Sequence, residues 1–150
     1  MLIESRSASE TKLLGHMFGE ELRHSLPNPN RAVVVALVGN LGSGKTTFTQ
    51  GFAKGLGARG RVASPTFILA RIHRITNSHF TRLVHMDAYR LSSARELPPL
   101  GFRELLTDPK TILLIEWADR IRSALPKGTI IIHSSHLRSE HRRSFSFSLR

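Results

Sequence analysis

Apolar residues recur along this chain of 150 residues with two different spacings. Between residues 8 and 24 they recur at helical spacing, which predicts an amphipathic helix with one apolar stripe. Ser7 and Glu10 stand where a capping box would open that helix, and Pro27 and Pro29 follow it in a loop. Shorter helices are predicted at residues 93–97, 102–106 and 118–125.

Six segments rich in apolar and β-branched residues predict strands. They are residues 33–38, 67–72, 81–86, 111–115, 129–133 and 144–149. A turn at Asn77-Ser78 joins the second and third of them into a predicted hairpin. The last one alternates Phe145, Phe147 and Leu149 with serines, as an amphipathic edge strand does. The pattern predicts one α/β domain, residues 1–150, whose mixed parallel and antiparallel sheet is flanked by helices in three layers.

A phosphate-binding motif lies between the first strand and the helix that follows it. The strand runs directly into Gly39-Asn40-Leu41-Gly42-Ser43-Gly44-Lys45-Thr46, which fits G-x-x-x-x-G-K-[ST] at every fixed position, and Thr47 opens a predicted helix. Strand, loop and helix in this order distinguish a true P-loop from a chance match. Glycines let the backbone turn its N–H groups around phosphate oxygens, and the helix directs its positive end to the same place. We therefore predict a P-loop NTPase-like domain that binds ATP or ADP through residues 40–47, with Lys45 at the β- and γ-phosphates and the Thr46 hydroxyl on Mg²⁺.

Two acidic residues stand at the ends of predicted strands, where a P-loop protein needs a carboxylate. Asp87 follows strand 81–86 and Glu116 follows strand 111–115. The carboxyl ends of parallel strands share the sheet edge at which ligands bind. Glu116 follows four consecutive apolar residues and is the better magnesium ligand, whereas Asp87 would bind Mg²⁺ through water or orient the attacking water. The predicted catalytic residues are Lys45, Asp87 and Glu116, and the predicted metal ligands are Thr46 and Glu116.

Other residues near the predicted site each have two interpretations. Thr11 either reaches the nucleotide or lies on the surface of the first helix. Trp117, the only tryptophan, either packs in the core or stacks on the base. Arg142 or Arg143 in the last hairpin either supplies a cation to phosphate or is an exposed charge. A histidine packed on its strand is the simpler account of His85, because no His, Asp and Glu spacing here is typical of zinc.

Composition limits the classes of protein and partner. The net charge of +11, from 22 basic and 11 acidic residues, predicts attraction to polyanions. The charges are spread along the chain and no nucleic-acid-binding module is present, so contact with tRNA stays open and no DNA partner is expected. The absence of cysteine is compatible with a reducing compartment. Without a signal-peptide pattern or an apolar run of 18 residues, we expect a cytoplasmic protein with no membrane partner.

Four sequence blocks together resemble one family, the bacterial ATPase TsaE (formerly YjeE) of threonylcarbamoyladenosine (t6A) biosynthesis. The blocks are residues 39–48, Ser64-Pro65-Thr66-Phe67, His85-Met86-Asp87-Ala88-Tyr89-Arg90-Leu91 and Leu114-Ile115-Glu116-Trp117. The P-loop alone is common to many enzymes. Its combination with Ser-Pro-Thr and Ile-Glu-Trp at these spacings is much more specific, and the resemblance covers nearly the whole chain.

The resemblance implies a Mg²⁺-dependent ATPase that acts on the TsaB–TsaD complex during t6A modification at position 37 of tRNAs that decode ANN codons. It implies weak ATP turnover by the chain alone, dependence on the partner proteins, and tRNA contact through the complex. By position, Lys45 corresponds to the phosphate lysine, Thr46 and Glu116 to the magnesium ligands, Asp87 to a catalytic acid and Trp117 to a residue at the nucleotide. Residues 64–66 would form a loop that responds to the γ-phosphate.

The sequence departs from the family at several positions. Asn40 and Ser43 stand at variable P-loop positions where Asp and Ala are common. The late family arginine lacks its usual preceding glycine, so Arg142 is chosen over Arg143 without a decisive reason.

Two other functions compete with the ATPase interpretation. A small P-loop kinase that phosphorylates a small molecule would need a lid, for which the proline-broken residues 92–106 are a poor match. A basic RNA-binding protein would bind tRNA tightly and with strong salt dependence.

Overall fold

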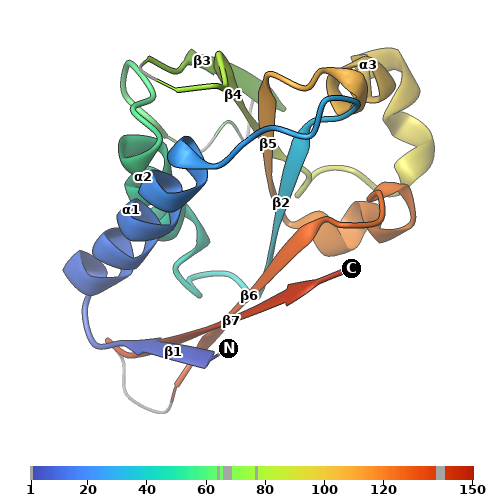
Figure 1. Ribbon diagram of the computed structural model, residues 1–150. Coiled ribbons are helices and arrows are strands. Elements are labelled where there is room, and N and C mark those ends of the chain that lie inside the picture. Colours follow the sequence, from blue (N-terminus) through green and yellow to red (C-terminus); the bar gives the residue numbers. More distant parts are fainter. Residues whose placement is uncertain (1, 64, 66–68, 77, 138–140) are drawn as a thin grey trace.

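The computed structural model describes residues 2–63, 65, 69–76, 78–137 and 141–150 (Figure 1). Seven strands form one sheet in the order β1-β7-β6-β2-β5-β4-β3. They are β1 (Leu2–Ser5), β2 (Val33–Val38), β3 (Ala70–Arg74), β4 (Arg82–Asp87), β5 (Thr111–Glu116), β6 (Ile130–His136) and β7 (Arg143–Leu149). The central strands β6, β2, β5 and β4 are parallel, whereas β7, β1 and β3 join antiparallel at the two edges.

Helices cover both faces of this sheet (Figure 1). Helices α1 (Ala8–His24) and α2 (Lys45–Gly55) pack on one face. The other face carries α3 (Phe102–Thr107) and the 3₁₀ turns η1 (Ala94–Glu96), η2 (Pro98–Leu100) and η3 (Ala118–Ala124). The α/β architecture with a mixed sheet between helices is the one predicted from the sequence. Among the described residues, no helix is both long and apolar enough to cross a membrane.

Alternating side chains of the central strands build two apolar cores, one on each face. Val35 and Leu37 of β2 pack with α1 and α2, while Val34 and Ala36 pack with the segments on the opposite face. Every residue of β5 is buried. Strands buried on both faces read as continuous apolar runs, which explains why β2 and β5 were the clearest strands in the sequence.

Glycines let α1 and α2 approach each other closely. A Cβ atom added to Gly15 would lie 2.2 Å from the carbonyl oxygen of Phe48, and one added to Gly51 would lie 2.0 Å from that of Lys12. Gly19 and Gly55 are equally tight against the backbone of the opposite helix. Real Cβ atoms do not approach this closely, so the packing of the P-loop helix requires these glycines. The spacing of residues in the sequence did not predict this contact between the two helices.

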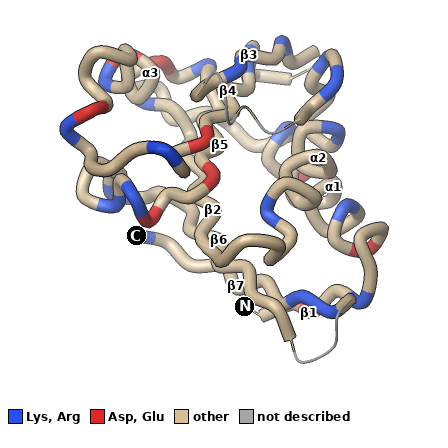
Figure 2. The backbone as a smooth tube through the Cα atoms, turned by 180° about the vertical axis from the view of Figure 1, so that it is seen from behind, with Lys and Arg blue, Asp and Glu red and all other residues tan. Residues whose placement is uncertain are grey.

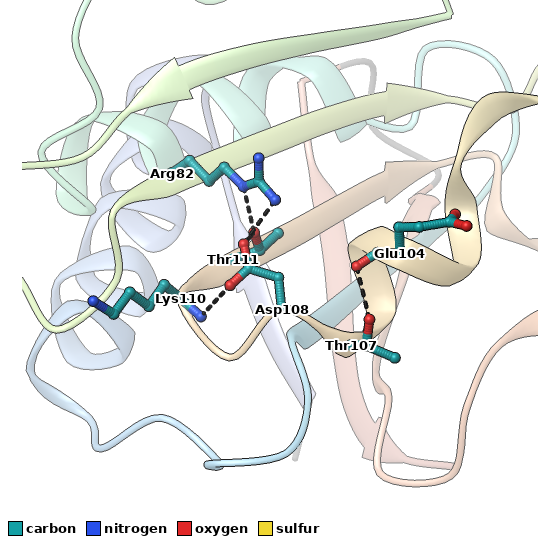
Figure 3. Close-up of polar contacts among 6 residues, drawn as sticks. All are labelled: Arg82, Glu104, Thr107, Asp108, Lys110 and Thr111. Atoms are coloured by element: carbon teal, nitrogen blue, oxygen red, sulfur yellow. Dashed lines mark hydrogen bonds and ion pairs between the residues drawn. The ribbon is translucent and has the colours of Figure 1, made fainter.

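The amino-terminal ends of β4 and β5 are joined by a polar cluster around Asp108 (Figure 3). Arg82 donates to Asp108 Oδ2 at 2.7 Å and to Thr111 Oγ1 at 2.6 Å, and Thr111 Oγ1 donates to the same carboxyl oxygen at 2.7 Å. Arg82 and Thr111 are the first residues of their strands and lie opposite each other. The same register places the last residues, Asp87 and Glu116, opposite each other at the other end.

Some predicted elements differ from the structure. Strand β1 was not predicted, because its four residues are short and carry no pattern of their own. Strand β3 runs from Ala70 to Arg74 instead of over residues 67–72, and residues 67 and 68 lie outside the described part of the chain. The predicted helix at 118–125 is the 3₁₀ segment η3, which is interrupted at Ile121 (φ −123°, ψ 26°). Pro98 and Pro99 begin η2, as expected for prolines at the start of a helical turn.

Candidate functional site

The P-loop connects the carboxyl end of β2 to α2. Gly42 (φ 73°) and Gly44 (φ 95°) adopt left-handed backbone conformations that favour glycine. Gly44 is the N-cap residue of α2 and makes no side-chain capping bond, so the first backbone N–H groups of the helix face the loop. This geometry gives the loop the donors and the helix end that bind phosphate.

Lys45 is the first residue of α2 and its side chain is held inside the site. Its Nζ donates hydrogen bonds to the carbonyl oxygens of Gly39 at 2.7 Å and Asn40 at 2.9 Å. The same nitrogen lies 3.8 Å from the centre of the Trp117 ring. Burial lowers the pKa of Lys45 below its ordinary value, and the nearby carboxylates of Glu116, Asp119 and Asp87 act in the opposite direction. The ammonium is therefore surrounded by groups that favour its charged form, although it is largely removed from water.

Glu116 connects the P-loop helix to the neighbouring strand β4. Its Oε2 accepts a hydrogen bond from Thr46 Oγ1 at 3.0 Å, and its Oε1 lies 2.8 Å from Nε2 of His85. Glu116 is 1% exposed and His85 is fully buried. The strand histidine is thus packed, as its sequence position suggested, but it also contacts the carboxylate predicted to bind metal.

Asp87 lies beside Glu116 at the ends of paired strands. Its Oδ1 accepts the backbone N–H of Tyr89 at 2.9 Å, and the side chain is 4% exposed. The Tyr89 ring packs against Trp117 with 4.9 Å between centroids. Tyr89 belongs to the block of residues 85–91 that resembles the family, but it was not among the residues predicted to line the site.

These residues line one pocket of about 350 Å³ at the carboxyl ends of the parallel strands. The predicted residues that line it are Leu41, Gly42, Gly44, Lys45, Thr46, Thr47, Asp87, Glu116 and Trp117. Tyr89 completes the lining. The structure therefore brings the predicted phosphate-binding residues and both predicted acids to one place.

A second pocket of about 320 Å³ adjoins the first, because Gly42, Gly44 and Thr47 line both. Thr11 lines this pocket, and its hydroxyl lies 2.7 Å from that of Ser5. The rest of the lining comes from the start of α1 and from the last hairpin: Arg6, Ser7, Ala8, His141 and Arg143. Thr11 is therefore next to the P-loop, as one of its two interpretations required.

Arg142 and Arg143 point in different directions. Arg142, the residue before β7, forms an ion pair with Glu4 of β1 and lines neither pocket. Arg143 donates from Nε to the carbonyl oxygen of Gly42 at 3.0 Å and lines the second pocket. The choice of Arg142 as the residue at the nucleotide is thus not supported by the geometry, because its guanidinium pairs with Glu4 and lies away from both pockets.

Two predicted P-loop side chains also lie away from the pockets. The Ser43 hydroxyl is buried and lies 2.7 Å from that of Ser134 in β6, so it fixes the loop to the sheet. Asn40 lines neither pocket and contributes its backbone carbonyl to the contact with Lys45. Of the predicted switch segment, Ser64 and Thr66 lie outside the described residues.

Thr46 and Glu116 fit a magnesium ion that is shared with a phosphate. Hydroxyl and carboxylate oxygens are suitable ligands for Mg²⁺, and the two side chains are already within 3.0 Å of each other. No group of three or more His, Asp or Glu side chains in the described part of the chain could hold a metal on its own. In many magnesium sites, phosphate oxygens and waters supply most of the ligands.

The mixed sheet, the loop and the paired strand-end acids define a P-loop NTPase-like α/β protein. The model of one protein family matches residues 5–145 of this chain. That family is described as threonylcarbamoyl adenosine biosynthesis protein TsaE. The chain belongs to the TsaE family.

Individual relatives agree with this assignment. The chain is 37% identical over 130 residues to the tRNA threonylcarbamoyladenosine biosynthesis protein TsaE of Treponema pallidum, covering 85% of this chain and 86% of the relative. It is 37% identical over 103 residues to the protein of the same name from Haemophilus influenzae, covering 69% of this chain but only 63% of that relative. The crystal structure of Bacillus subtilis YdiB superposes with a TM-score of 0.73 at 27% identity, covering 99% of this chain and 84% of YdiB.

Proposed function

We propose that this protein binds and hydrolyses ATP with Mg²⁺ and that this activity serves t6A modification of tRNA. One observation carries the proposal: a single pocket in a TsaE-family chain is lined by Lys45, Thr46, Asp87 and Glu116. The names of the relatives supply the biological process, and the pocket supplies the chemistry. The proposal places the protein in the cytoplasm.

In this proposal the triphosphate occupies the first pocket and the nucleoside extends towards the second. The two pockets share Gly42, Gly44 and Thr47, so one elongated ligand can fill both. Lys45 exchanges its bonds to the carbonyls of Gly39 and Asn40 for bonds to phosphate oxygens. The P-loop does not distinguish adenine from guanine, and the absence of an N/T-K-x-D motif favours ATP.

The reacting end of the triphosphate lies between α2 and the ends of β4 and β5. Thr46 and Glu116 would hold a magnesium ion, which would neutralise charge on the phosphates of the nucleotide. Asp87 lies opposite Glu116 in the sheet and is the group available to orient the attacking water and accept its proton. Lys45 stabilises the charge that develops on the transferred phosphoryl group.

The proposed partners are TsaB and TsaD, with tRNA reached through their complex. Figure 2 shows lysine and arginine distributed over much of the backbone, without one dominant basic segment. This distribution gives no special support to tight tRNA binding by the chain alone. The lid required by a kinase is not favoured either, because residues 94–107 pack on the sheet face opposite to α1 and α2.

The test is ATP hydrolysis by the purified protein with and without TsaB, TsaD and tRNA. We expect weak turnover alone and a clear change with the partners. Glu116→Ala should lower kcat by at least about 100-fold while retaining the nucleotide affinity measured without Mg²⁺, since it removes a metal ligand and leaves the phosphate-binding loop intact. Glu21→Ala, at an exposed acid on α1, is the matched control and should behave as wild type.

Several outcomes would contradict parts of the proposal. Equal hydrolysis by Glu116→Ala and wild type would remove the assigned role of Glu116. Turnover that ignores the partner proteins would leave an ATPase without the t6A role. Phosphoryl transfer to a metabolite in preference to water would favour the kinase, and salt-sensitive tRNA binding by the isolated chain would favour the RNA-binding alternative.

A further inference from the structure

We propose that His85 is a positioning residue that fixes the Glu116 carboxylate so that one of its oxygens faces the magnesium ion. This inference rests on the proposed function, because it assumes that Thr46 and Glu116 bind the metal. His85 itself lies beneath the site and lines neither pocket. Its influence on the metal therefore passes through Glu116.

The sheet register brings the two side chains together. His85 and Asp87 are two residues apart on β4 and so project from the same face of the sheet. Glu116 lies opposite Asp87 on the neighbouring strand β5, on the face covered by α2. The Nε2 to Oε1 distance is 2.8 Å, and both side chains are at most 2% exposed.

Both oxygens of the Glu116 carboxylate have a defined partner. His85 lies against Oε1, and Thr46 donates to Oε2 at 3.0 Å. Because the two partners come from different elements, β4 and α2, the plane of the carboxylate is fixed from two sides. Oε2, the oxygen beside Thr46, is the one directed to the proposed metal. Hydrogen-bonding partners behind metal ligands orient them in this way.

The side chain of His85 has no other hydrogen bond within the described part of the chain. Its Nδ1 is buried and finds no partner there. A carboxylate accepts and does not donate, so the bond to Glu116 requires a proton on Nε2. A histidine retained only for packing would not need this polar contact, since an apolar side chain fills buried space without leaving a nitrogen unpaired.

Three substitutions separate positioning from packing. His85→Gln keeps an amide N–H donor near the place of Nε2. His85→Asn carries the same amide but is too short to reach Glu116. His85→Met fills similar space and has no donor. If the imidazole acts through its hydrogen bond, only the glutamine variant retains the wild-type behaviour.

The measurement is the affinity for a non-hydrolysable ATP analogue by isothermal titration calorimetry, with and without Mg²⁺. The ratio of the two affinities reports the contribution of the metal and does not depend on turnover. We expect His85→Met and His85→Asn to lower this ratio by 10- to 100-fold. His85→Gln should stay within a few-fold of wild type. In a Glu116→Gln background, His85→Met should cause no further loss, because the two residues act as one unit.

Melting temperature is recorded for every variant as the measure of packing. A ratio that is unchanged in folded His85→Met or His85→Asn, even with a lowered melting temperature, would overturn the role of His85. An equal loss of the affinity ratio in His85→Gln and His85→Asn would also overturn the role of His85. The ability of the side-chain amide to reach Glu116 would then make no difference. If the wild type itself shows no effect of Mg²⁺ on affinity, the metal assignment of the proposed function fails first, and this inference fails with it.

Discussion

The ammonium nitrogen of Lys45 lies 3.8 Å from the centre of the Trp117 ring, so the P-loop lysine and the only tryptophan of the chain are in direct contact. The contact is a cation–π interaction between α2 and the residue that follows β5. Trp117 holds this place with a left-handed backbone (φ 58°), which is uncommon for a non-glycine residue. The electronic environment of its ring therefore depends on where the lysine points.

Nucleotide binding should change the fluorescence of Trp117. When Lys45 turns to phosphate, the cation leaves the ring, and we expect a saturable change in emission during titration with ADP or ATP. Lys45→Ala should bind nucleotide at least about tenfold more weakly, which corresponds to about 1.4 kcal/mol. Lys54→Ala, at an exposed lysine on the same helix, is the control. Binding seen by calorimetry with no change in emission would contradict the movement of Lys45.

The close approach of α1 and α2 predicts a large effect of a single methyl group. Gly51→Ala would place Cβ 2.0 Å from the carbonyl oxygen of Lys12, so the two helices must separate. We expect a loss of about 1–3 kcal/mol in the free energy of unfolding, measured with urea. Gln50→Ala, one residue earlier, adds no such clash and should be neutral or slightly stabilising. Unchanged stability of Gly51→Ala would mean that the helices are not held this tightly.

The cluster around Asp108 predicts that stability falls in acid. The hydrogen bond from Thr111 is the largest cause that lowers the pKa of Asp108 below its ordinary value, with the Lys110 backbone and Arg82 acting in the same direction. Because the folded pKa is below the unfolded one, the stabilisation is complete above the unfolded value of about 3.9 and is lost as the pH falls through the folded pKa.

Asp108→Asn tests this dependence. We expect it to lower the free energy of unfolding by about 1–2 kcal/mol at pH 6 to 7. The difference from wild type should shrink as the pH falls below about 4 and vanish below the folded pKa of Asp108, where both proteins carry a neutral side chain. Glu104→Gln, at an exposed acid on nearby α3, is the control (Figure 3). A difference that is independent of pH would show that the charge of Asp108 does not stabilise the fold.

Sequence patterns predicted the parts of this protein that depend on local order. The P-loop, Asp87 and Glu116 follow buried strands directly, so their places could be inferred without knowing which strands pair. Strand β1, the Gly15 and Gly51 contacts and the packing of Tyr89 on Trp117 depend on partners that are distant in the sequence. The spacing of apolar residues along the sequence does not identify such partners. The contact between His85 and Glu116 belongs to the same group, because it requires the register of β4 against β5.

The neighbouring residues Arg142 and Arg143, at the start of β7, give a matched pair for the second pocket. Arg143 lines that pocket and donates to the Gly42 carbonyl, whereas Arg142 forms an exposed ion pair with Glu4. Arg143→Ala should weaken ATP binding by about tenfold, because it removes both a cation beside the P-loop and a bond that holds the loop. Arg142→Ala should change the affinity by less than about twofold, since exposed ion pairs contribute little. Calorimetry on both variants decides between them. A larger loss in Arg142→Ala would show that the last hairpin rearranges when nucleotide binds.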